Sequence, residues 1–261
     1  MNSLVQDQKL HNPTLRVLVL LRLIDAHPEG ISLAAISEQL QMPKGTISPI
    51  LKTLAATGYI TYENAKYQIG YRSFELGLSY GKGSDLLEII NKQMKNLVAE
   101  VDEISQFGVL NGYDVLYLLR VNAENPISII SEVGKRVPAH ATGLGKALLS
   151  LKTDEWLEEK YRDHHFEKIG PKCITSFDEL MAAIREVRKN GFAYDKEEAS
   201  EGVSCTAVPI YLEGSIQGAL SVTAPKYRLN ERKQNLIEKC LIRSKSLIEE
   251  IARIQGLHLQ G

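Results

Sequence analysis

ISLAAISEQLQ at residues 31–41 and PKGTISPILKTLAATGYI at residues 43–60 are two short helical patterns that follow each other across a tight turn. The apolar positions of the second pattern, which are expected to face a core, are Ile47, Ile50, Leu51 and Leu54. Residues 59–62 and 66–69 then alternate with period two, which indicates a small β-hairpin. Helix, turn, helix and hairpin in this order are typical of a winged helix-turn-helix, which places one helix in the DNA major groove.

The solvent-facing side of the second helix is short, polar and basic. It consists of Lys44, Gly45, Thr46, Ser48, Pro49 and Lys52. Hydroxyl and ammonium groups suit phosphate oxygens and base edges, so all of these except Pro49 are candidate DNA contacts. Asn64 and Lys66, which are expected at the tip of the hairpin, join them. The alternative is a solvated face of a purely structural bundle, but the adjoining hairpin favours DNA binding.

Length and composition fit two domains and no membrane span. The chain has 261 residues, more than one helix-turn-helix needs, and no apolar run reaches the roughly 18 residues of a spanning helix. Its first residues lack the apolar stretch of a signal peptide, so we expect a cytoplasmic protein. Three cysteines without CxxC spacing indicate neither a zinc ribbon nor a disulfide framework, and we expect no metal and no other cofactor.

The charge is distributed unevenly, although the net charge is only −1. Residues 1–82 hold eight Lys or Arg against six Asp or Glu, a balance of +2, and the remainder carries −3. This small asymmetry predicts modest non-specific DNA affinity for one subunit, with strength coming from dimeric binding.

A Gly- and Ser-rich stretch, GLSYGKGS at residues 77–84, marks a domain boundary. We expect a DNA-binding domain over 10–71, a linker over 72–84 and a second domain over 85–257. The helix-like segments of the second domain are 85–101, 143–151, 153–162, 178–190 and 230–255, and the strand-like segments are 104–110, 115–121, 127–132, 204–211 and 215–223. Their alternation predicts an antiparallel sheet flanked by helices, an α+β fold. The closing helix is expected to bury Leu236, Cys240, Leu241, Leu247, Ile248 and Ile251.

Two segments of this domain carry candidate chemistry. In VPAHATGLGKALLS (137–150), a Gly-x-Gly turn opens a helix, so its free amides provide a site for a small carboxylate. An ordinary structural turn is the alternative. On the final strand Gln217, Ala219, Ser221 and Thr223 share one face. This face suits the wall of a polar pocket or, alternatively, a solvent-facing edge.

The chain resembles the isocitrate-lyase-regulator (IclR) family of bacterial transcription factors over nearly its whole length. The matching segments are TLRVLVLLRLI (14–24), MPKGTISPILKTLAATGYI (42–60), YQIGYRSFELG (67–77), HATGLGKALL (140–149), GFAYDKEE (191–198), GVSC (202–205), AVPI (207–210) and GALSVTAP (218–225). One departure is Pro49 on the reading helix, where family members often carry Arg or another large polar residue. Pro inside a helix removes a hydrogen bond, and here it also removes a base reader.

The resemblance implies a ligand-controlled repressor of a metabolic operon, which binds double-stranded operator DNA as a homodimer or a dimer of dimers. It also implies that residues 85–257 form a GAF-like effector domain that senses small organic acids. The positions that match the family's ligand contacts are Gly143, Leu144, Asp195, Cys205, Ser221 and Thr223. Leu144 and Thr223 are larger than their counterparts in several relatives, which alters the size of the pocket.

Two other functions fit some of the same residues. Cys205, His140 and Asp195 are the residue types of a small-molecule hydrolase, but such a site needs a base within hydrogen-bond reach of the thiol. The second alternative is a dimeric scaffold whose helix-turn-helix does not bind DNA.

Overall fold

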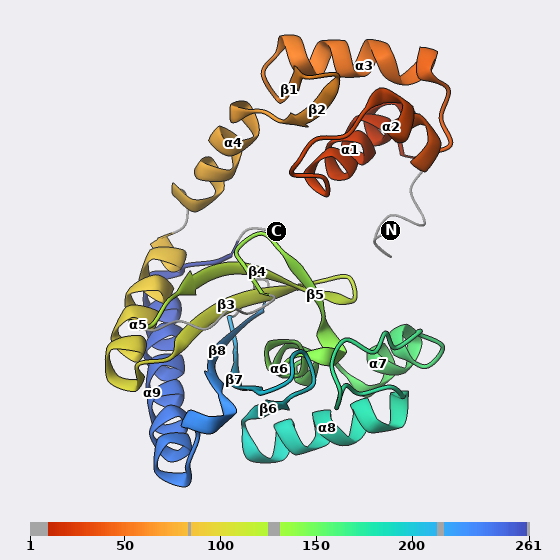
Figure 1. Ribbon diagram of the computed structural model, residues 1–261. Helices are drawn as coiled ribbons and strands as arrows, with labels where there is room; N and C mark the ends of the chain where they lie inside the picture. Colours follow the sequence, from red (N-terminus) through yellow and green to blue (C-terminus); the bar gives the residue numbers. More distant parts are fainter. Residues whose placement is uncertain (1–9, 83–84, 125–130, 213–216, 260–261) are drawn as a thin grey trace. The chain divides into compact units, whose positions relative to one another are not determined.

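The structure is a computed structural model that describes residues 10–82, 85–124, 131–212 and 217–259 (Figure 1). The chain divides into two compact units, Met1–Gly83 and Ser84–Gly261. Each unit has a hydrophobic core of its own. None of the helices in the described ranges is long and apolar enough to cross a membrane.

The amino-terminal unit is a three-helix bundle with a two-stranded wing. Its elements are α1 (Asn12–Asp25), α2 (Leu33–Gln39), α3 (Lys44–Ala56), β1 (Ile60–Glu63) and β2 (Lys66–Ile69). The predicted inward face of α3 is confirmed, because Ile47 and Leu51 are fully buried and Leu54 is 8% exposed. The fourth predicted residue, Ile50, is half-buried and packs against the same core. Ser32 caps α2 by accepting a hydrogen bond from the amide of Ala35 at 3.2 Å.

The turn between α2 and α3 is fixed by local hydrogen bonds. The Ser37 hydroxyl donates to the carbonyl of Met42 at 2.7 Å, and the Met42 amide donates to the carbonyl of Ser37 at 3.1 Å. Gln41 takes a left-handed backbone conformation here, with φ of 50°. Pro49 lies in the interior of α3, so the carbonyl of Gly45 loses its usual amide donor on the exposed face of the helix.

The boundary segment is largely helical. Residues 77–82 of the Gly- and Ser-rich stretch belong to α4 (Tyr71–Lys82), and residues 83–84 lie outside the described ranges. Several large apolar side chains of α4 are exposed, among them Tyr71 at 63% and Phe74 at 67%. An apolar helix face without cover in one subunit is typical of an interaction surface.

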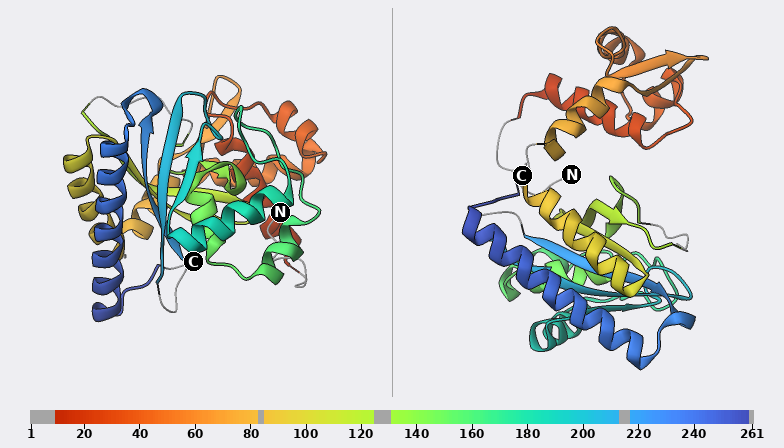
Figure 2. Two further views of the ribbon diagram at one scale, coloured as in Figure 1. Left: turned by 90° about the horizontal axis from the view of Figure 1, so that it is seen from below. Right: turned by 90° about the vertical axis from the view of Figure 1, so that its left-hand side faces the viewer.

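The carboxy-terminal unit is an α+β domain, as predicted. Its elements are α5 (Asp85–Val101), β3 (Ile104–Asn111), β4 (Asp114–Val121), β5 (Arg136–Pro138), the 3₁₀ turn η2 (Ala139–Ala141), α6 (Gly143–Ser150), α7 (Asp154–Tyr161), α8 (Phe177–Asn190), β6 (Ala193–Lys196), β7 (Val203–Ile210), β8 (Gly218–Pro225), the 3₁₀ turn η3 (Lys226–Arg228) and α9 (Glu231–Gln255). The six strands form one antiparallel sheet in the order β5-β4-β3-β8-β7-β6. Helices α5 and α9 lie side by side on one face, and α6 to α8 cover the other, which gives three layers (Figure 2).

One predicted strand, 127–132, is not tested over most of its length, because residues 125–130 lie outside the described ranges. Residues 131 and 132 are not in a strand, and the edge of the sheet is formed instead by the short β5, which the sequence did not indicate. Strand β6, within the GFAYDKEE segment, forms the opposite edge.

Strand β8 runs through the middle of the sheet and is buried along its whole length. Its side chains alternate as predicted, with Leu220 and Val222 in the core beneath α5 and α9, and Ala219 in the core beneath α6 to α8. The alternative of a solvent-facing edge is therefore wrong.

The predicted buried face of α9 is wrong at two positions, and a third predicted residue, Ile251, is only half-buried. Leu236 and Leu247 are each 38% exposed. The residues of α9 that are buried are Ile237, Cys240, Leu241, Ser244, Ile248 and Ala252. When a long helix carries apolar residues on several sides, its sequence does not show which side is buried. In α9 the buried side is the one that contacts α5 and the sheet.

Candidate functional site

The candidate DNA-binding face is the exposed side of α3. Lys44, Gly45, Ser48 and Lys52 are exposed, and Thr46 is half-buried. The side chains of Ile47 and Leu51 hold the opposite side of the helix in the core, so these polar groups point to solvent. The arrangement presents two ammonium groups and two hydroxyls on one short helix, which suits contact with phosphates.

The wing ends in a two-residue turn. Asn64 and Ala65 have φ of 51° and 59°, values that a type I′ hairpin turn requires and that Asn tolerates well. Asn64 therefore stands at the tip, as predicted. Lys66 is the first residue of the returning strand, opposite Glu63, and its ammonium donates to the carbonyl of Glu29 at 3.3 Å. This contact anchors the wing against the turn that precedes α2.

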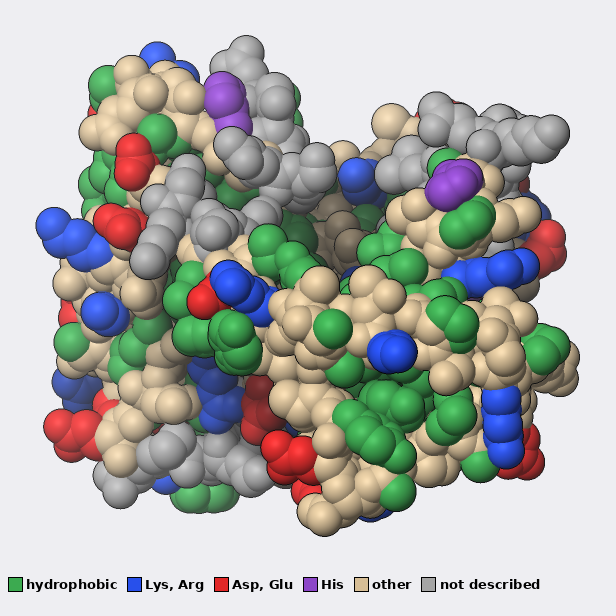
Figure 3. Space-filling view, turned by 90° about the horizontal axis from the view of Figure 1, so that it is seen from above, with side chains coloured by type: hydrophobic (Ala, Val, Ile, Leu, Met, Phe, Trp, Pro, Cys, Tyr) green, Lys and Arg blue, Asp and Glu red, His purple; other side chains and the backbone are tan. Residues whose placement is uncertain are grey.

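Basic side chains are spread thinly over the surface in view in Figure 3. Among the described residues there, Lys and Arg appear as separate spots between apolar and neutral groups rather than as one broad patch. This distribution agrees with the charge balance of the sequence. Non-specific attraction to DNA is therefore modest for one subunit.

The candidate effector site is a small cavity of about 30 Å³ between the sheet and the amino-terminal end of α6. Its walls are Gln106, Tyr117, Ser131, Thr142, Gly143, Asp195, Ala199, Ser200, Val203, Cys205 and Thr223. Four of the six residues named from the sequence thus meet at one place: Gly143, Asp195, Cys205 and Thr223.

The other two candidates are adjacent but do not line the cavity. The Leu144 side chain is 1% exposed and packs into the core beneath α6 to α8. Ser221 is fully buried, and its hydroxyl lies 3.5 Å from the carbonyl of Gln106 on the neighbouring strand. In this conformation only the backbone amide of Leu144 is available to a ligand, and the Ser221 hydroxyl contacts the backbone of β3.

The amino-terminal end of α6 points its first amides toward this cavity. Thr142 caps the helix and accepts the amide of Gly145 at 2.9 Å. Within the described chain, the amides of Gly143 and Leu144 have no protein acceptor. A Cβ on Gly143 would lie 3.1 Å from the Cys205 sulfur, so the backbone approaches β7 closely at this point. Free amides at the positive end of a helix provide a site for an anion.

The far wall of the cavity is a polar network that sequence reasoning missed. The amide nitrogen of Gln106, on β3, donates to the hydroxyl of Ser131 at 2.8 Å and to its carbonyl at 3.0 Å. The Thr223 hydroxyl donates to the amide oxygen of Gln106 at 3.4 Å. The one available signal in the sequence was a glutamine in the middle of a mostly apolar strand, and this glutamine is 2% exposed in the fold.

Burial controls the ionisation of the two reactive side chains in the cavity. It raises the pKa of the Asp195 carboxyl to about 6, even though the amide of Glu198 donates to that carboxyl at 2.7 Å. Burial, together with the nearby Asp195, raises the pKa of the Cys205 thiol to about 12. The Cys205 thiol is therefore neutral at physiological pH. The Asp195 carboxyl, with a pKa of about 6, titrates just below physiological pH.

A buried ion pair between Lys146 and Glu198 lies next to Asp195, one of the residues that line the cavity. The Lys146 ammonium on α6, 3% exposed, donates to both carboxylate oxygens of Glu198 at 2.5 and 2.6 Å and to the carbonyl of Tyr194 at 2.5 Å. Glu198 in turn donates its amide to Asp195. Lys146 thus ties α6 to the β6–β7 connection beside the cavity.

The Asp195 environment predicts a pH-dependent stabilisation by Asp195→Asn. Because the folded pKa lies above its ordinary value of 3.8, stability is greatest with the carboxyl protonated at low pH and falls as pH rises through about 6. The side chain of Asn at position 195 does not ionise, so the variant does not lose stability as the pH rises. We expect the stability gain from Asp195→Asn to be larger at pH 7.5 than at pH 5 by about 1 kcal/mol.

Urea unfolding followed by the fluorescence of Trp156, the only tryptophan in the chain, measures this gain in the carboxy-terminal unit. Thr206→Val, a substitution at a buried hydroxyl on the neighbouring β7, serves as the pH-independent control. An equal gain from Asp195→Asn at both pH values contradicts the assignment of a raised pKa.

The fold and the cavity define the class of protein. A winged helix-turn-helix is joined to an α+β domain that holds a small polar cavity, an arrangement typical of a ligand-responsive DNA-binding regulator. Comparison with known protein families agrees with this assignment. The IclR helix-turn-helix domain matches residues 14–64, and the bacterial transcriptional regulator IclR C-terminal domain matches residues 78–247. The chain belongs to the IclR family of bacterial transcriptional regulators.

Curated relatives are regulators of the same kind. The HTH-type transcriptional regulator KdgR of Dickeya chrysanthemi is 30% identical over 204 residues, covering 77% of this chain and 67% of that protein. XynR of Escherichia coli K12 is 28% identical over 219 residues, covering 83% of this chain and 87% of XynR. The repressor AllR of the same organism is 27% identical over 220 residues, covering 83% and 81%.

Solved structures show the same fold. An IclR transcriptional regulator from Alicyclobacillus acidocaldarius superposes with a TM-score of 0.82 at 20% identity, covering 92% of this chain and 98% of that one. An IclR homolog from Microbacterium hydrocarbonoxydans, crystallised with 4-hydroxybenzoate, gives a TM-score of 0.77 at 22% identity, covering 92% and 99%.

Proposed function

We propose that this regulator is a repressor of a metabolic operon whose hold on its operator is controlled by a small carboxylate bound beside α6. The carrying observation is that two free helix amides, at Gly143 and Leu144, lie at the end of α6 beside a polar cavity that is lined by Gly143 and by a titratable carboxyl, Asp195. A carboxylate can accept both amides without any charged side chain of opposite sign. The homolog crystallised with 4-hydroxybenzoate, itself a carboxylate, supports this ligand class.

We propose that Lys44, Gly45, Thr46, Ser48 and Lys52 contact operator DNA, with Asn64 and Lys66 of the wing contacting the flanking backbone. Two such units in a homodimer read two half-sites about one helical turn (roughly 34 Å) apart or a multiple of it. The exposed apolar face of α4, with Tyr71 and Phe74, is our candidate for the dimer contact, and a dimer of dimers remains compatible with it. Residues 70–101, which include α4 and α5, join the two domains and are our candidate for the transmitter between them.

The ligand acts by population shift. It changes DNA affinity only by the difference in its affinity for the two arrangements of the linked domains, typically about 1–3 kcal/mol. The cavity of about 30 Å³ holds a carboxylate group, so a larger effector has to displace the connection that contains Ala199 and Ser200. Effectors of two to four carbons require the smallest displacement.

A hydrolase built on Cys205 is disfavoured by the chemistry of its thiol. A nucleophilic cysteine needs a lowered pKa, and burial raises that of Cys205 to about 12. The His140 ring nitrogen Nε2 instead lies 3.0 Å from the carbonyl of Glu167, and its ring packs against Phe166. Blocking Cys205 by alkylation is expected to alter the ligand response. Abolition of a turnover by the same treatment would instead support a hydrolase.

A thermal-shift screen tests the effector site. Acetate, glyoxylate, pyruvate and 4-hydroxybenzoate are compared with acetamide, which lacks the charge. We expect at least one acid to raise the melting temperature by about 5 °C or more at 100 times its Kd, because binding then adds about 2.7 kcal/mol. Acetamide should give no shift.

Variants at the cavity make the screen specific. Asp195→Ala and Thr223→Val should each reduce the shift, because both side chains line the cavity, whereas Ser221→Ala should change it less. A hit that survives both Asp195→Ala and Thr223→Val unchanged shows that the effector binds elsewhere.

A further inference from the structure

A second and larger cavity lies at the β6–β7 edge of the same domain. It encloses about 470 Å³, within the range of roughly 300–1,000 Å³ typical of small-molecule sites. Its wall includes Tyr194 paired with Thr206, whereas Asp195 is paired with Cys205. Residues opposite each other in an antiparallel pair share a face, and neighbours along a strand alternate. The Tyr194–Thr206 wall is therefore on the opposite face of the sheet from the Asp195 side chain. Asp195 and Cys205 line both cavities, so the β6–β7 strand pair is the wall that the two cavities share.

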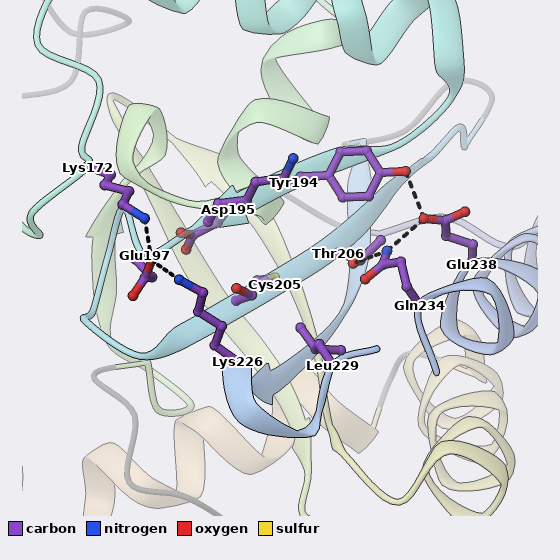
Figure 4. A pocket seen from close by; sticks show the side chains of 12 residues that line it. Lys172, Tyr194, Asp195, Glu197, Cys205, Thr206, Lys226, Leu229, Gln234 and Glu238 are labelled. Carbon is purple, nitrogen blue, oxygen red and sulfur yellow. Dashed lines mark hydrogen bonds and ion pairs between the residues drawn. The ribbon is translucent and has the colours of Figure 1, made fainter. Parts of the chain in front are cut away.

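One end of this outer cavity is basic. Lys172 and Lys226 both pair with a single carboxylate, that of Glu197, with the Lys226 ammonium at 3.0 Å (Figure 4). The two lysines hold the pKa of Glu197 at about 2, so the carboxylate is ionised and leaves one positive charge in excess. The Lys196 ammonium is not part of this end, because it lies 5.6 Å from the centre of the Tyr194 ring. An anionic group is attracted to this end.

The other end carries hydrogen-bonding groups without excess positive charge. The Tyr194 hydroxyl donates to Glu238 at 2.9 Å, and the Gln234 amide donates to the same oxygen at 2.6 Å and to the Thr206 hydroxyl at 3.0 Å (Figure 4). Within the described residues, the second carboxylate oxygen of Glu238 and the amide oxygen of Gln234 have no protein donor. Both are acceptors, and ligand hydroxyls are the donors that suit them. Leu229 supplies an apolar surface beside them.

We propose that this outer cavity is a second ligand site, distinct from the effector cavity, for a small polyhydroxylated metabolite that carries one anionic group, a phosphate or a carboxylate. The anion binds at Lys172 and Lys226, and hydroxyls of the ligand donate to Glu238 and Gln234. A neutral sugar can bind only at the end that carries Glu238 and Gln234, and a simple anion can bind only at the end that carries Lys172 and Lys226.

Isothermal titration calorimetry of the full chain tests this proposal with four probes. Glucose 6-phosphate and gluconate carry both kinds of group, glucose lacks the anion, and inorganic phosphate lacks the carbon-bound hydroxyls. We expect glucose 6-phosphate or gluconate to bind at least about tenfold more tightly than glucose or phosphate. The tighter of the two identifies the anion as a phosphate or a carboxylate. Equal binding of all four, or binding of none, overturns the proposal.

Variants locate the binding. Lys172→Ala with Lys226→Ala should weaken the better probe by at least about tenfold, and Glu238→Gln, at the opposite end, should weaken it severalfold. Lys239→Ala, an exposed lysine on α9 outside the cavity wall, is the matched control and should leave the Kd unchanged. Trp156 fluorescence confirms that the variants remain folded. Glu238 makes no contact with Glu197. The Glu238→Gln result therefore remains informative if replacing both lysines, which removes their ion pairs with Glu197, destabilises the protein locally.

The two sites are separable in the same experiment. Thr223→Val alters the inner cavity and should leave the binding of glucose 6-phosphate and gluconate unchanged. If Thr223→Val abolishes this binding and the outer variants do not, the probes bind in the inner cavity and the second site does not exist. If no small acid shifts the melting temperature of the wild type while glucose 6-phosphate or gluconate still binds, the proposed effector site is contradicted and the outer site stands.

Discussion

Replacing Lys44 and Lys52 by Glu is expected to reduce affinity for operator DNA at least about a hundredfold at 150 mM salt. Both ammonium groups are exposed on the same face of α3, so each reversal removes an attraction to phosphate and adds a repulsion. A dimer loses four such contacts. The slope of log Kd against log salt should therefore fall by about 3 to 4, because each lost phosphate contact accounts for roughly 0.9.

The measurement is fluorescence anisotropy on the genomic fragment that the wild type binds most tightly, at several salt concentrations. Lys189→Glu with Lys239→Glu changes the net charge equally, on exposed positions of α8 and α9, and should have little effect. Sedimentation should show the same assembly state for all three proteins. If both double variants lose affinity equally, general charge rather than α3 governs binding, and a scaffold function becomes the better explanation.

Gly145→Ala is expected to destabilise the carboxy-terminal unit by about 3 kcal/mol or more. A Cβ at this position would lie 2.0 Å from the carbonyl oxygen of Ala139, a backbone atom that cannot rotate away. Accommodation requires α6 to move away from the η2 turn, through a core in which Leu144, Ala147 and Leu148 are buried. Overpacking of a well-filled interior costs about 1–3 kcal/mol and more where the backbone must shift.

Gly143→Ala is the matched comparison, two residues away in the same helix. Its Cβ would meet the Cys205 sulfur at 3.1 Å, a side-chain contact that can relax. Urea unfolding followed by Trp156 fluorescence should therefore show a much smaller loss for Gly143→Ala than for Gly145→Ala. Equal midpoints for the two variants would falsify the assignment of a backbone clash at Gly145.

The buried side of an element could be predicted from the sequence where its own apolar residues lie in a single stripe. In α3 the apolar residues occupy one stripe, so Ile47, Leu51 and Leu54 could be placed inside without knowledge of their neighbours. In α9 they occupy several sides of a 25-residue helix. The choice between Leu236 and Ile237 depended on the position of α5 and the sheet, which periodicity alone does not contain.

The candidate site shows the same division. Gly143, Asp195, Cys205 and Thr223 stand in recognisable motifs, and the fold places them around one cavity. Gln106 belongs to no motif, and it reaches the cavity because β3 pairs with β8, which places it opposite Ser221, 115 residues away. Long-range strand pairing is set by the whole domain, so partners of this kind were beyond local reasoning.

The small size of the inner cavity has a kinetic consequence. Its volume of about 30 Å³ accommodates roughly two water molecules, and its wall includes Ala199 and Ser200 from the connection between β6 and β7. If the proposed effector binds in this cavity, we expect a metabolite of several atoms to enter and to leave only when that connection moves aside. Such excursions take about microseconds to milliseconds, so exchange is limited by the opening frequency rather than by diffusion. We therefore expect the lag between a change in metabolite level and a change in promoter occupancy to depend partly on residues 197–202.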